Sequence, residues 1–530
     1  MLGSKFLEKQ AALNADVKLN PHQQRVVNNP STSQIIAHGV GSGKTVTSIA
    51  KFEDMKGKGK AKKALVITPA GLRDNYGPKG VGRFTDSKYN IVGNSQERSS
   101  HMYGGVDPDA DYNIMSYEMY RRNPEKYIKE SGADTVITDE AHRGKNESTQ
   151  TLKALKKARP LYKNHIALTG SLISNGISDL QPIVDVTTNG HNEIGKNKKD
   201  FERKWLKHAG GKKYRNVPES RRPVVGFNHE KRLARDLAQV VDYVDYDDVK
   251  KLADMPGKRI HIEKVPLSKE QAKIYKGILR NDKSVRRMIR NKRLETLNDK
   301  ERAEAFNKMR EARKLMNSVG SVKPGISIRK SAEITPKTKK MLDDLDAHLK
   351  ADPKNSAILF SHLVNGGVDV MEAGLKNRGI EYGKFIGKGN DGVTEESRTK
   401  DVNDYNDHKK RVMIVSPAGV EGLSLNDTTW EGVLDPHYNP EVMNQMEARG
   451  VRSGGLKGRK DRNVDITRYI ATMPKRFGIF KDSRKTPDEV IYEISRQKAA
   501  QNQVLYDMLK RSRGKVASYE DAIMEKIGGI

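Results

Sequence analysis

The 530-residue sequence contains no cysteine, which excludes disulfide bonds, thiolate metal sites and cysteine nucleophiles. Long hydrophobic runs are also missing. The most apolar segments, such as Ala357–Phe360, have the length of a strand and are far too short to span a membrane. The N-terminal stretch has an acidic residue, Glu8, and no extended apolar core, unlike a signal peptide. These absences predict a soluble protein of the cytoplasm.

Acidic residues are scarce relative to basic ones, with 68 Asp and Glu against 98 Lys and Arg, a formal net charge of +30. An excess of this size, spread along the whole length, favours a polyanionic partner, and we predict nucleic acid. The alternative is that the charge only keeps the protein in solution. A chain of this length favours about three domains.

Short runs of β-branched and apolar residues alternate with helical stretches in two separate blocks. Near-continuous apolar strands between helices are typical of parallel sheets covered on both faces. The sequence therefore predicts an α/β protein with two parallel-sheet domains in tandem. The expected strands are Gln34–Ala37, Ala64–Thr68, Tyr112–Met115, Thr135–Thr138 and His165–Leu168, then Ala357–Phe360, Tyr382–Ile386, Arg411–Val415 and Gly432–Leu434.

A long polar region separates the two blocks. Its most basic part, Arg280–Lys314, carries Lys or Arg at nearly every turn over a sparse apolar stripe, which predicts a protruding helix or helical pair. Arg286, Arg287 and Arg290 in this part are candidate nucleic-acid contacts, and the alternative is a solvated charged face.

A C-terminal helix is expected to begin at the segment Thr-Pro-Asp-Glu, residues 486–489. A capping residue, a proline in the first turn and two acids mark a helix start there, and the helix is expected to end near Arg513.

The segment His-Gly-Val-Gly-Ser-Gly-Lys-Thr, residues 38–45, has the composition of a phosphate-binding loop. It follows an expected strand and precedes an expected helix, Val46–Met55, whose N-terminus favours an anion. Lys44 is expected to reach the β- and γ-phosphates, and Thr45 to offer its hydroxyl to Mg²⁺. His38 stands where the pattern has its first glycine, and we expect it to form a local hydrogen bond. The candidate nucleotide-binding residues are Gly39, Gly41, Ser42, Gly43, Lys44 and Thr45.

A second chemical signature is the segment Thr-Val-Ile-Thr-Asp-Glu-Ala-His, residues 135–142, which puts an acidic pair at the end of a buried strand. Asp139 is expected to hold Mg²⁺ and Glu140 to polarise the attacking water. Transfer of a γ-phosphoryl group needs both roles, because its charged transition state is stabilised by positioning and electrostatics. The two signatures together predict hydrolysis of ATP with Mg²⁺.

Further segments accompany the two signatures along the chain, namely Leu19–Gln23, Val66–Ala70, Asn113–Glu118, Ala167–Ser171, Ile358–Ser361, Ser416–Leu425 and Asp435–Pro440, the last followed by Gln445, Arg449 and Arg452. In this order and spacing, these motifs resemble those of the superfamily 2 helicase-type motors of the Snf2-like branch over roughly residues 15–510. The Ser-Gly-Gly after Arg452, and a phosphate loop without an acidic lead-in, resemble the compact viral and phage members, which for a viral protein implies the host cytoplasm. The resemblance implies ATP and Mg²⁺ as cofactors and two tandem RecA-like domains with a helical basic insertion and a C-terminal brace helix. The expected boundaries are 1–250 for the N-terminal RecA-like ATP-binding domain, 251–335 for the helical basic linker, 336–480 for the C-terminal RecA-like helicase domain and 481–530 for the C-terminal helical extension.

The resemblance also implies roles for single residues. Gln23 would contact the adenine, with a plain surface residue as the alternative, and Gly422 is expected at the nucleotide. Arg449 and Arg452 would act as arginine fingers. The residues expected to couple the ATP side to the nucleic-acid side are His142, Thr169, Ser171 and Gln445, where Thr169 and Ser171 could alternatively form only a turn that ends a strand. The further predicted nucleic-acid contacts are Thr68, Pro69, Ser116, Tyr117, Ser361 and Ser416.

The predicted function is an ATP-driven translocase on double-stranded DNA that displaces or remodels bound proteins and works as a monomer away from membranes. One alternative is a strand-separating DNA helicase. Another is the motor subunit of a larger transcription, packaging or restriction complex with protein partners. A pseudo-enzyme that only binds DNA is disfavoured, because Lys44, Asp139, Glu140 and Arg452 are all present.

Overall fold

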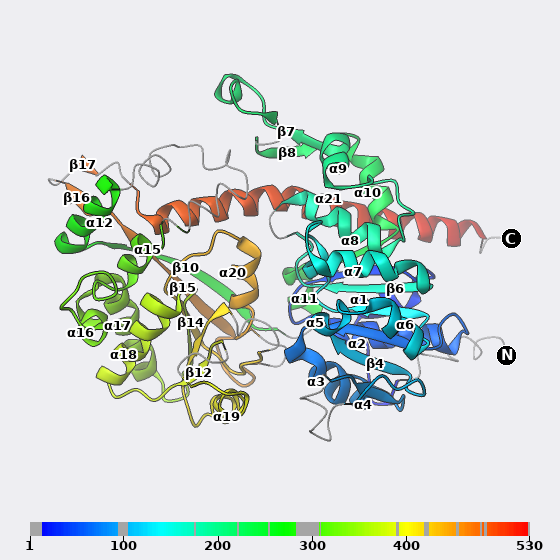
Figure 1. Cartoon of the computed structure of the whole chain (residues 1–530), viewed down its shortest axis with the longest axis horizontal. Coiled ribbons are helices and arrows are strands. Elements are labelled where there is room, and N and C mark those ends of the chain that lie inside the picture. The colour runs from blue at the N-terminus through cyan, green and yellow to red at the C-terminus, as the bar shows by residue number, and fades with distance from the viewer. Residues whose placement is uncertain are drawn as a thin grey trace. The chain divides into compact units, whose positions relative to one another are not determined.

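The computed structural model describes residues 13–93, 104–173, 176–219, 222–252, 255–281, 307, 309–387, 392–417, 423–451, 455–476, 480–481 and 485–527. Within these ranges no helix has both the length and the apolar character needed to cross a bilayer. The chain divides into two compact units (Figure 1). The first comprises Met1–His208, Val224–Ala253 and Gln501–Ile530, and the second comprises Ala209–Pro223 and Asp254–Ala500.

The first unit is built on a seven-stranded sheet with the order β3-β4-β2-β5-β6-β1-β9, in which every pairing is parallel. All five strands predicted in the first block are present. The two outermost strands, β3 and β9, were not predicted, because they are short and only part of each is buried. The strands are β1 Gln34–His38, β2 Ala64–Thr68, β3 Tyr89–Ile91, β4 Tyr112–Ser116, β5 Thr135–Thr138, β6 Asn164–Thr169 and β9 Val241–Val244.

Helices cover both faces of this sheet. Successive residues of β2 point to opposite faces, so that Leu65 and Ile67 belong to one apolar cluster and Val66 to another. Both clusters are buried, which explains why the central strands are apolar throughout. The helices of this unit are α1 Pro21–Asn28, α2 Lys44–Gly57, α3 Arg73–Tyr76, α4 Gly82–Phe84, α5 Tyr117–Tyr120, α6 Pro124–Ser131, α7 Gln150–Ala158, α8 Leu180–Thr187, α9 Lys198–Trp205, α10 Glu230–Ala238 and α11 Tyr246–Leu252.

The second unit is built on a six-stranded, fully parallel sheet with the order β10-β15-β14-β11-β13-β12. The four strands predicted in the second block are present. The ten-residue strands β10 and β15 were not predicted, because β10 is largely exposed and carries charged residues such as Arg259, which pairs with Asp465 of β15. The strands are β10 Gly257–Pro266, β11 Ala357–Phe360, β12 Gly383–Phe385, β13 Val412–Val415, β14 Trp430–Val433 and β15 Asn463–Thr472.

Helices also pack on this second sheet, and Leu342 and Leu345 of α17 share an apolar cluster with Leu359 of β11. Two tandem RecA-like domains are therefore confirmed as the fold. The helices of this unit are α12 Lys269–Asn281, α15 Arg310–Asn317, α16 Ile328–Ile334, α17 Pro336–Ala351, α18 Asp369–Asn377, α19 Glu395–Asn406 and α20 Pro440–Glu447, with a small antiparallel pair formed by β16 Lys475–Arg476 and β17 Phe480–Lys481.

The predicted basic protrusion lies mostly outside the described residues. Of Arg280–Lys314, the structure describes the end of α12, residue 307 and the segment from residue 309 into α15. Arg286, Arg287 and Arg290 lie outside the described residues, so their predicted contacts stay predictions.

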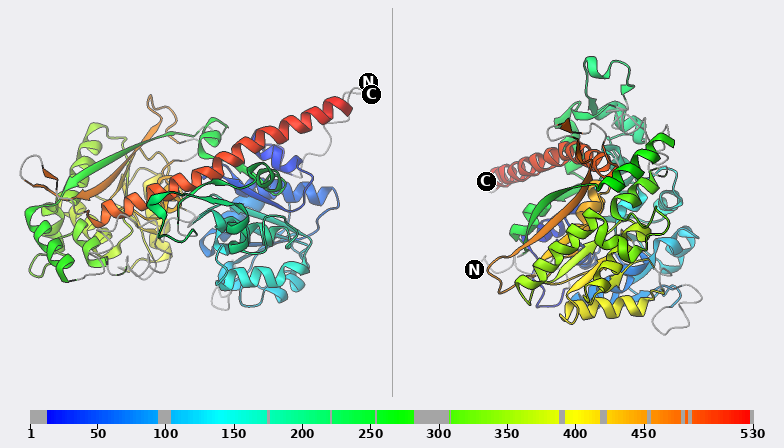
Figure 2. Two further views of the ribbon diagram at one scale, coloured as in Figure 1. Left: turned by 90° about the horizontal axis from the view of Figure 1, so that it is seen from above. Right: turned by 90° about the vertical axis from the view of Figure 1, so that its left-hand side faces the viewer.

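A single long helix, α21, runs from Pro487 to Ile527 (Figure 2, left). Its start is capped as predicted, since Thr486 Oγ1 accepts a hydrogen bond from Glu489 N and Glu489 Oε2 accepts one from Thr486 N. The helix continues past the predicted end near Arg513, because one glycine at 514 costs only about 1 kcal/mol in a helix.

Candidate nucleotide-binding site

The predicted phosphate loop connects β1 to α2, with Gly43 as the N-cap of α2 in the left-handed region. Gly41 and Gly43 have φ angles of 83° and 75°, which other residues rarely adopt. A Cβ atom on Gly43 would also lie 2.6 Å from Nε2 of Gln23. The loop conformation therefore depends on glycine at these two positions.

Residues at the start of α1 hold this loop from one side. Gln23 Nε2 donates to the carbonyl of Ser42 at 3.1 Å, and His22 Nε2 lies 3.0 Å from the same carbonyl oxygen. Gln23 is 4% exposed, which argues against the alternative of a surface residue. The structure thus brings Gln23 to the phosphate loop, and its contact with adenine stays a prediction.

Lys44 lies across the loop. Its Nζ donates to the carbonyls of His38 at 3.0 Å and Gly39 at 3.3 Å, which curls the side chain back over the loop backbone. A Cβ atom added to Gly170, in the turn after β6, would lie 3.4 Å from this amine. The ammonium group is therefore placed where the loop amides and the strand ends meet.

His38, at the position of the usual first glycine, is completely buried. Its Nε2 lies 2.7 Å from Asp242 Oδ1 in β9, and Arg25 of α1 donates to both oxygens of the same carboxylate at 2.7 and 2.8 Å. Burial lowers the pKa of His38 to about 4 despite the nearby Asp242, so the ring is neutral at pH 7. The expected local hydrogen bond is instead a long-range one that fastens the loop to β9 and α1.

The acidic pair follows β5. Asp139 accepts hydrogen bonds from Thr68 Oγ1 at 3.2 Å and from Glu140 N at 3.0 Å, while Glu140 has a positive φ of 53°. Burial and the charge of Glu140 raise the pKa of Asp139 to about 7, opposed by Lys44 and Thr68. The two predicted motifs therefore interact electrostatically. A cation at Asp139 would favour its charged form.

Thr45 and Asp139, the predicted Mg²⁺ ligands, supply only side-chain oxygens, which suit a hard cation. Among the described residues no group of three or more His, Asp or Glu side chains forms a metal site on its own. Such a site is not needed here, because Mg²⁺ is usually held by one or two protein oxygens together with substrate phosphates and water.

Three of the predicted coupling residues form one connected chain with Glu140. His142 Nδ1 lies 3.2 Å from Glu140 Oε2 and 3.4 Å from Thr169 Oγ1. Thr169 in turn donates to the carbonyl of Ser171 at 2.7 Å, and Ser171 Oγ donates to Ile173 O at 2.9 Å. A path of polar contacts thus runs from the acidic pair to the turn after β6. Gln445 lies half-buried on α20 of the second unit.

The predicted nucleic-acid contacts that the structure describes are buried. Thr68 donates to Asp139, Tyr117 donates to the Asp139 carbonyl at 2.8 Å, and Ser361 donates to the carboxylate of Asp435. Ser116 accepts from Met119 N as the cap of α5. These hydroxyls therefore stabilise the interior of each unit, and their contact with phosphates stays a prediction. The buried residues of this group are Thr68, Pro69, Ser116, Tyr117, Ser361 and Ser416.

In the second unit, Arg449 follows α20 and is 7% exposed. Its Nη1 donates to Leu423 O at 3.4 Å, and its own carbonyl accepts from Leu425 N at 3.3 Å. Arg452 and Gly422 lie outside the described residues. The turn that carries Arg449 is thus hydrogen-bonded to Leu423 and Leu425, which follow the predicted nucleotide-binding residue Gly422 in the chain.

Two buried glutamates lie beneath this arginine-bearing turn. Glu447, at the end of α20, is bound by Arg468 of β15 at 2.6 and 2.7 Å. Glu431 of β14 accepts from the backbone of Gly450, and a Cβ atom on Gly450 would lie 2.6 Å from its Oε1. Burial and the charge of Glu447 raise the pKa of Glu431 well above its usual value of 4.5.

This raised pKa predicts a stability difference that depends on pH. The folded protein keeps a proton that the unfolded chain releases, so the stability contributed by Glu431 falls as pH rises from 4.5 towards the raised pKa. Over that pH window, we expect the free energy of unfolding of Glu431→Gln to rise relative to that of the parent by up to about 1.4 kcal/mol per pH unit. Urea unfolding at several pH values measures this, with exposed Glu396→Gln as the control. Parallel pH profiles for parent and Glu431→Gln would contradict the assignment.

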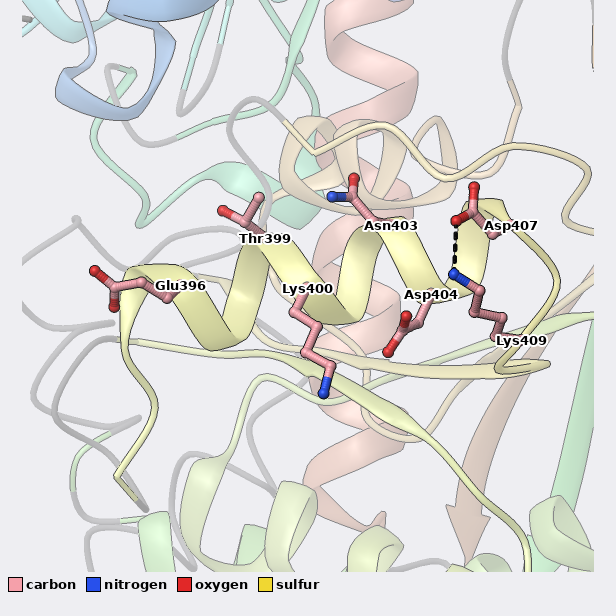
Figure 3. A pocket seen from close by; sticks show the side chains of 7 residues that line it. All are labelled: Glu396, Thr399, Lys400, Asn403, Asp404, Asp407 and Lys409. Carbon is pink, nitrogen blue, oxygen red and sulfur yellow. Dashed lines mark hydrogen bonds and ion pairs between the residues drawn. The ribbon is translucent and has the colours of Figure 1, made fainter.

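An open surface groove lies along α19 of the second unit (Figure 3). Its lining is exposed and mostly charged, and Lys409 pairs with Asp407 at 3.1 Å within it. None of its residues belongs to the predicted nucleotide or nucleic-acid sites. We therefore assign no function to this groove.

The fold and the site define a class. A phosphate loop, an acidic pair and a polar coupling turn lie at the ends of neighbouring strands of a RecA-like sheet, and a second RecA-like sheet follows. This is the organisation of a helicase-type ATPase of superfamily 2. The SNF2-related domain family matches residues 22–321, and the helicase conserved C-terminal domain matches residues 339–454. The chain belongs to the SNF2-related family.

Curated relatives include a putative ATP-dependent RNA helicase of Acanthamoeba polyphaga mimivirus, 23% identical over 73% of this chain and 80% of the relative. A probable chromatin-remodeling complex ATPase chain of Oryza sativa subsp. japonica is 24% identical over 80% of this chain and 36% of the relative. The solved Sulfolobus solfataricus SWI2/SNF2 ATPase core in complex with dsDNA gives a TM-score of 0.39 at 20% identity, covering 88% of this chain and 90% of that chain. This chain spans less than half the length of that rice relative and of several other curated relatives.

Proposed function

We propose that the protein couples ATP hydrolysis to movement along nucleic acid, with double-stranded DNA as the substrate. The observation that carries this proposal is the connected chain from Asp139 and Glu140 through His142 to Thr169. An enzyme that only hydrolysed ATP would not require a polar path leading away from its acidic pair. Family membership and the second RecA-like unit support the same reading.

In this proposal the loop amides and Lys44 bind the β- and γ-phosphates of ATP, and Thr45 and Asp139 hold Mg²⁺. The metal supplies charge neutralisation at the phosphates. Glu140 orients and polarises the attacking water, because its carboxylate is adjacent to Asp139 and is positioned by His142. Arg449 and Arg452 neutralise negative charge that develops on the γ-phosphoryl group.

The coupling step follows from the same contacts. Loss of the γ-phosphate changes the charge beside Glu140, and His142 is held between Glu140 and Thr169. A shift of His142 therefore alters the turn at Thr169 and Ser171. We propose that this turn relays the nucleotide state to the nucleic-acid side, as expected for a switch that biases one of two arrangements.

The charge of the chain supports a nucleic-acid substrate read through its phosphates. With +30 at pH 7, binding is expected to be salt-dependent and independent of base sequence. DNA is favoured by two relatives, one named an ATP-dependent DNA helicase of Arabidopsis thaliana and the other the chromatin-remodeling ATPase chain of Oryza sativa. The mimiviral relative is named an RNA helicase, so RNA is the necessary comparison. A strand-separating helicase and a motor subunit of a larger complex are the other candidates.

The decisive experiment compares ATPase rates with duplex DNA, single-stranded DNA and RNA at equal phosphate concentration. We expect duplex DNA to stimulate hydrolysis at least about tenfold over the basal rate, since phosphate contacts favour the state that hydrolyses ATP. Displacement of a third strand from a triplex, without unwinding of a forked duplex, then identifies translocation. Unwinding of the fork would favour the helicase, and a basal rate indifferent to every nucleic acid would contradict the proposal.

A further inference from the structure

A basic β-hairpin lies outside the protrusion that the sequence had suggested. It consists of β7 Leu206–His208, β8 Val224–Phe227 and the loop between them, and we call residues 206–227 the basic arm. The arm contains six lysines and arginines and one acidic residue, Glu219. Figure 1 labels the two strands at its base, β7 and β8. Its charge density is high even for this basic chain.

The base of the arm is firmly built. Leu206 and Phe227 face each other across the two strands and belong to the buried cluster that contains Trp205 of α9. Asn228 N donates to the carbonyl of Trp205 at 2.7 Å, which continues the pairing beyond the strands. The arm is therefore anchored to a hydrophobic core.

The loop has internal contacts of its own. Ala209 N donates to Pro223 O at 2.8 Å, which extends the pairing past a bulge between Lys207 and His208. Within the loop, Arg222 Nε donates to the carbonyl of Val217 at 2.9 Å, and a short 3₁₀ turn covers Lys212–Tyr214. The connection thus has defined turns.

The cations of the arm are left uncompensated. Lys207, Lys212 and Arg215 are exposed, and in the part of the chain that the structure describes they form no ion pair or hydrogen bond through their side chains. Like charges carried on one short segment repel one another, and acidic neighbours would relieve that repulsion. The sequence provides only Glu219 within the arm for that purpose.

Three exposed arginines on the adjoining helices differ from these cations, because each lies close to an acidic side chain. Arg203 of α9 pairs with Asp200 at 2.7 Å, and Arg235 of α10 lies 3.3 Å from Asp236. Arg232 of α10 lies 3.4 Å from a glutamate, Glu193. These three arginines therefore have acidic partners, and the three exposed cations on the arm do not. Exposed cations without an acidic partner are available to an external anion.

We propose that the basic arm binds the phosphate backbone of a nucleic-acid duplex, as a contact surface separate from the helicase motifs. This inference rests on the proposed function. A two-stranded ribbon fits the major groove of B-DNA, which is about 12 Å wide, and exposed Lys and Arg on its loop reach the flanking phosphates. Because phosphates carry no sequence information, the arm adds affinity and orientation without base specificity.

The test is charge reversal on the arm with a matched control. The arm variant carries Lys207→Glu, Lys212→Glu and Arg215→Glu, and the control carries Arg203→Glu, Arg232→Glu and Arg235→Glu on the neighbouring helices. Both change the net charge equally and alter only exposed side chains. Binding of a fluorescent DNA duplex is measured over a series of salt concentrations.

We expect the arm variant to bind duplex at least about tenfold more weakly, with a salt slope smaller by about 2.7, or 0.9 for each of three lost phosphate contacts. The control should lose less than about one unit of slope, because its arginines already have acidic partners. The basal ATPase rate without nucleic acid should equal that of the parent in both variants. Circular dichroism confirms that the variants fold.

An unchanged slope in the arm variant would overturn the proposal. So would unchanged duplex binding together with weaker binding of poly-glutamate, which would assign the arm to an acidic protein partner instead. Failure of the proposed function gives a different result. In that case no nucleic acid stimulates the ATPase rate of the parent protein, whereas if only the proposal for the arm is wrong, this stimulation of the parent is still observed.

Discussion

Replacing Glu140 by glutamine is expected to lower kcat for ATP hydrolysis by about 10²–10⁴-fold, the range typical for loss of a group that takes up or directs a proton. Glutamine keeps the size of the side chain and its reach to His142, which lies 3.2 Å from the carboxylate, but it cannot polarise water as a carboxylate does. ATP binding and duplex DNA binding should remain nearly unchanged. Steady-state ATPase assays at saturating DNA, with a filter-binding measurement of affinity, check both parts.

A matched control for this variant is Glu118→Gln. Glu118 is about half-exposed and pairs with Arg143, which follows the acidic pair closely in the chain, but Glu118 lies outside the proposed site. It should leave kcat unchanged. Lys44→Ala removes the amine that is proposed to bind the β- and γ-phosphates, and ATP hydrolysis by this variant should also be lost. Parental, DNA-stimulated turnover in Glu140→Gln or in Lys44→Ala would refute the site assignment.

Replacing Arg449 by alanine is expected to lower kcat by about 10³–10⁵-fold, as for the loss of an arginine finger. KM for ATP should change much less, because the guanidinium is needed when charge develops on the transferred phosphoryl group. Single-turnover hydrolysis, which isolates the chemical step, is the measurement.

Arg449 is largely buried and donates to Leu423 O, so its removal also affects the local structure. Arg449→Lys separates the two effects, since lysine keeps the charge and loses the planar fork. A catalytic role predicts a partial recovery of kcat in the lysine variant at similar thermal stability. Parental turnover in Arg449→Ala would remove this residue from the mechanism.

Burial explains which parts of the fold the sequence predicts. Strands such as β2 and β11 are covered on both faces and therefore read as continuous apolar runs. The pair β10–β15 is as regular in hydrogen bonding, but β10 has an exposed, charged face, with Arg259 bound to Asp465 across the pair. Such strands resemble polar linkers in sequence, which is why residues 251–335 are predicted as a helical basic linker and β10 is not predicted.

The chemistry of the site was predictable where it lies in short motifs. Lys44, Asp139 and Glu140 are each defined by the few residues around them, and the structure brings their motifs together. The long-range hydrogen bonds that hold the phosphate loop in place were not predictable from such motifs. His38 bonds Asp242, which lies 204 positions away in the chain, and no local spacing reveals that pair. Thr68 is predicted to contact nucleic acid. In this structure its hydroxyl donates to Asp139, and the contact with nucleic acid stays a prediction.

The long helix α21 limits how this protein is divided for experiments. Leu505 and Met508 complete a hydrophobic cluster of the first unit, whereas Val490 and Ile494 of the same helix complete one in the second. Its start is pinned by a buried pair between Lys337 and Asp488. A recombinant fragment that ends after residue 253 would lack Leu505 and Met508 and would therefore expose apolar residues of this cluster to solvent. A fragment of the first unit intended for expression should include the part of α21 from residue 501 onward, joined through a linker.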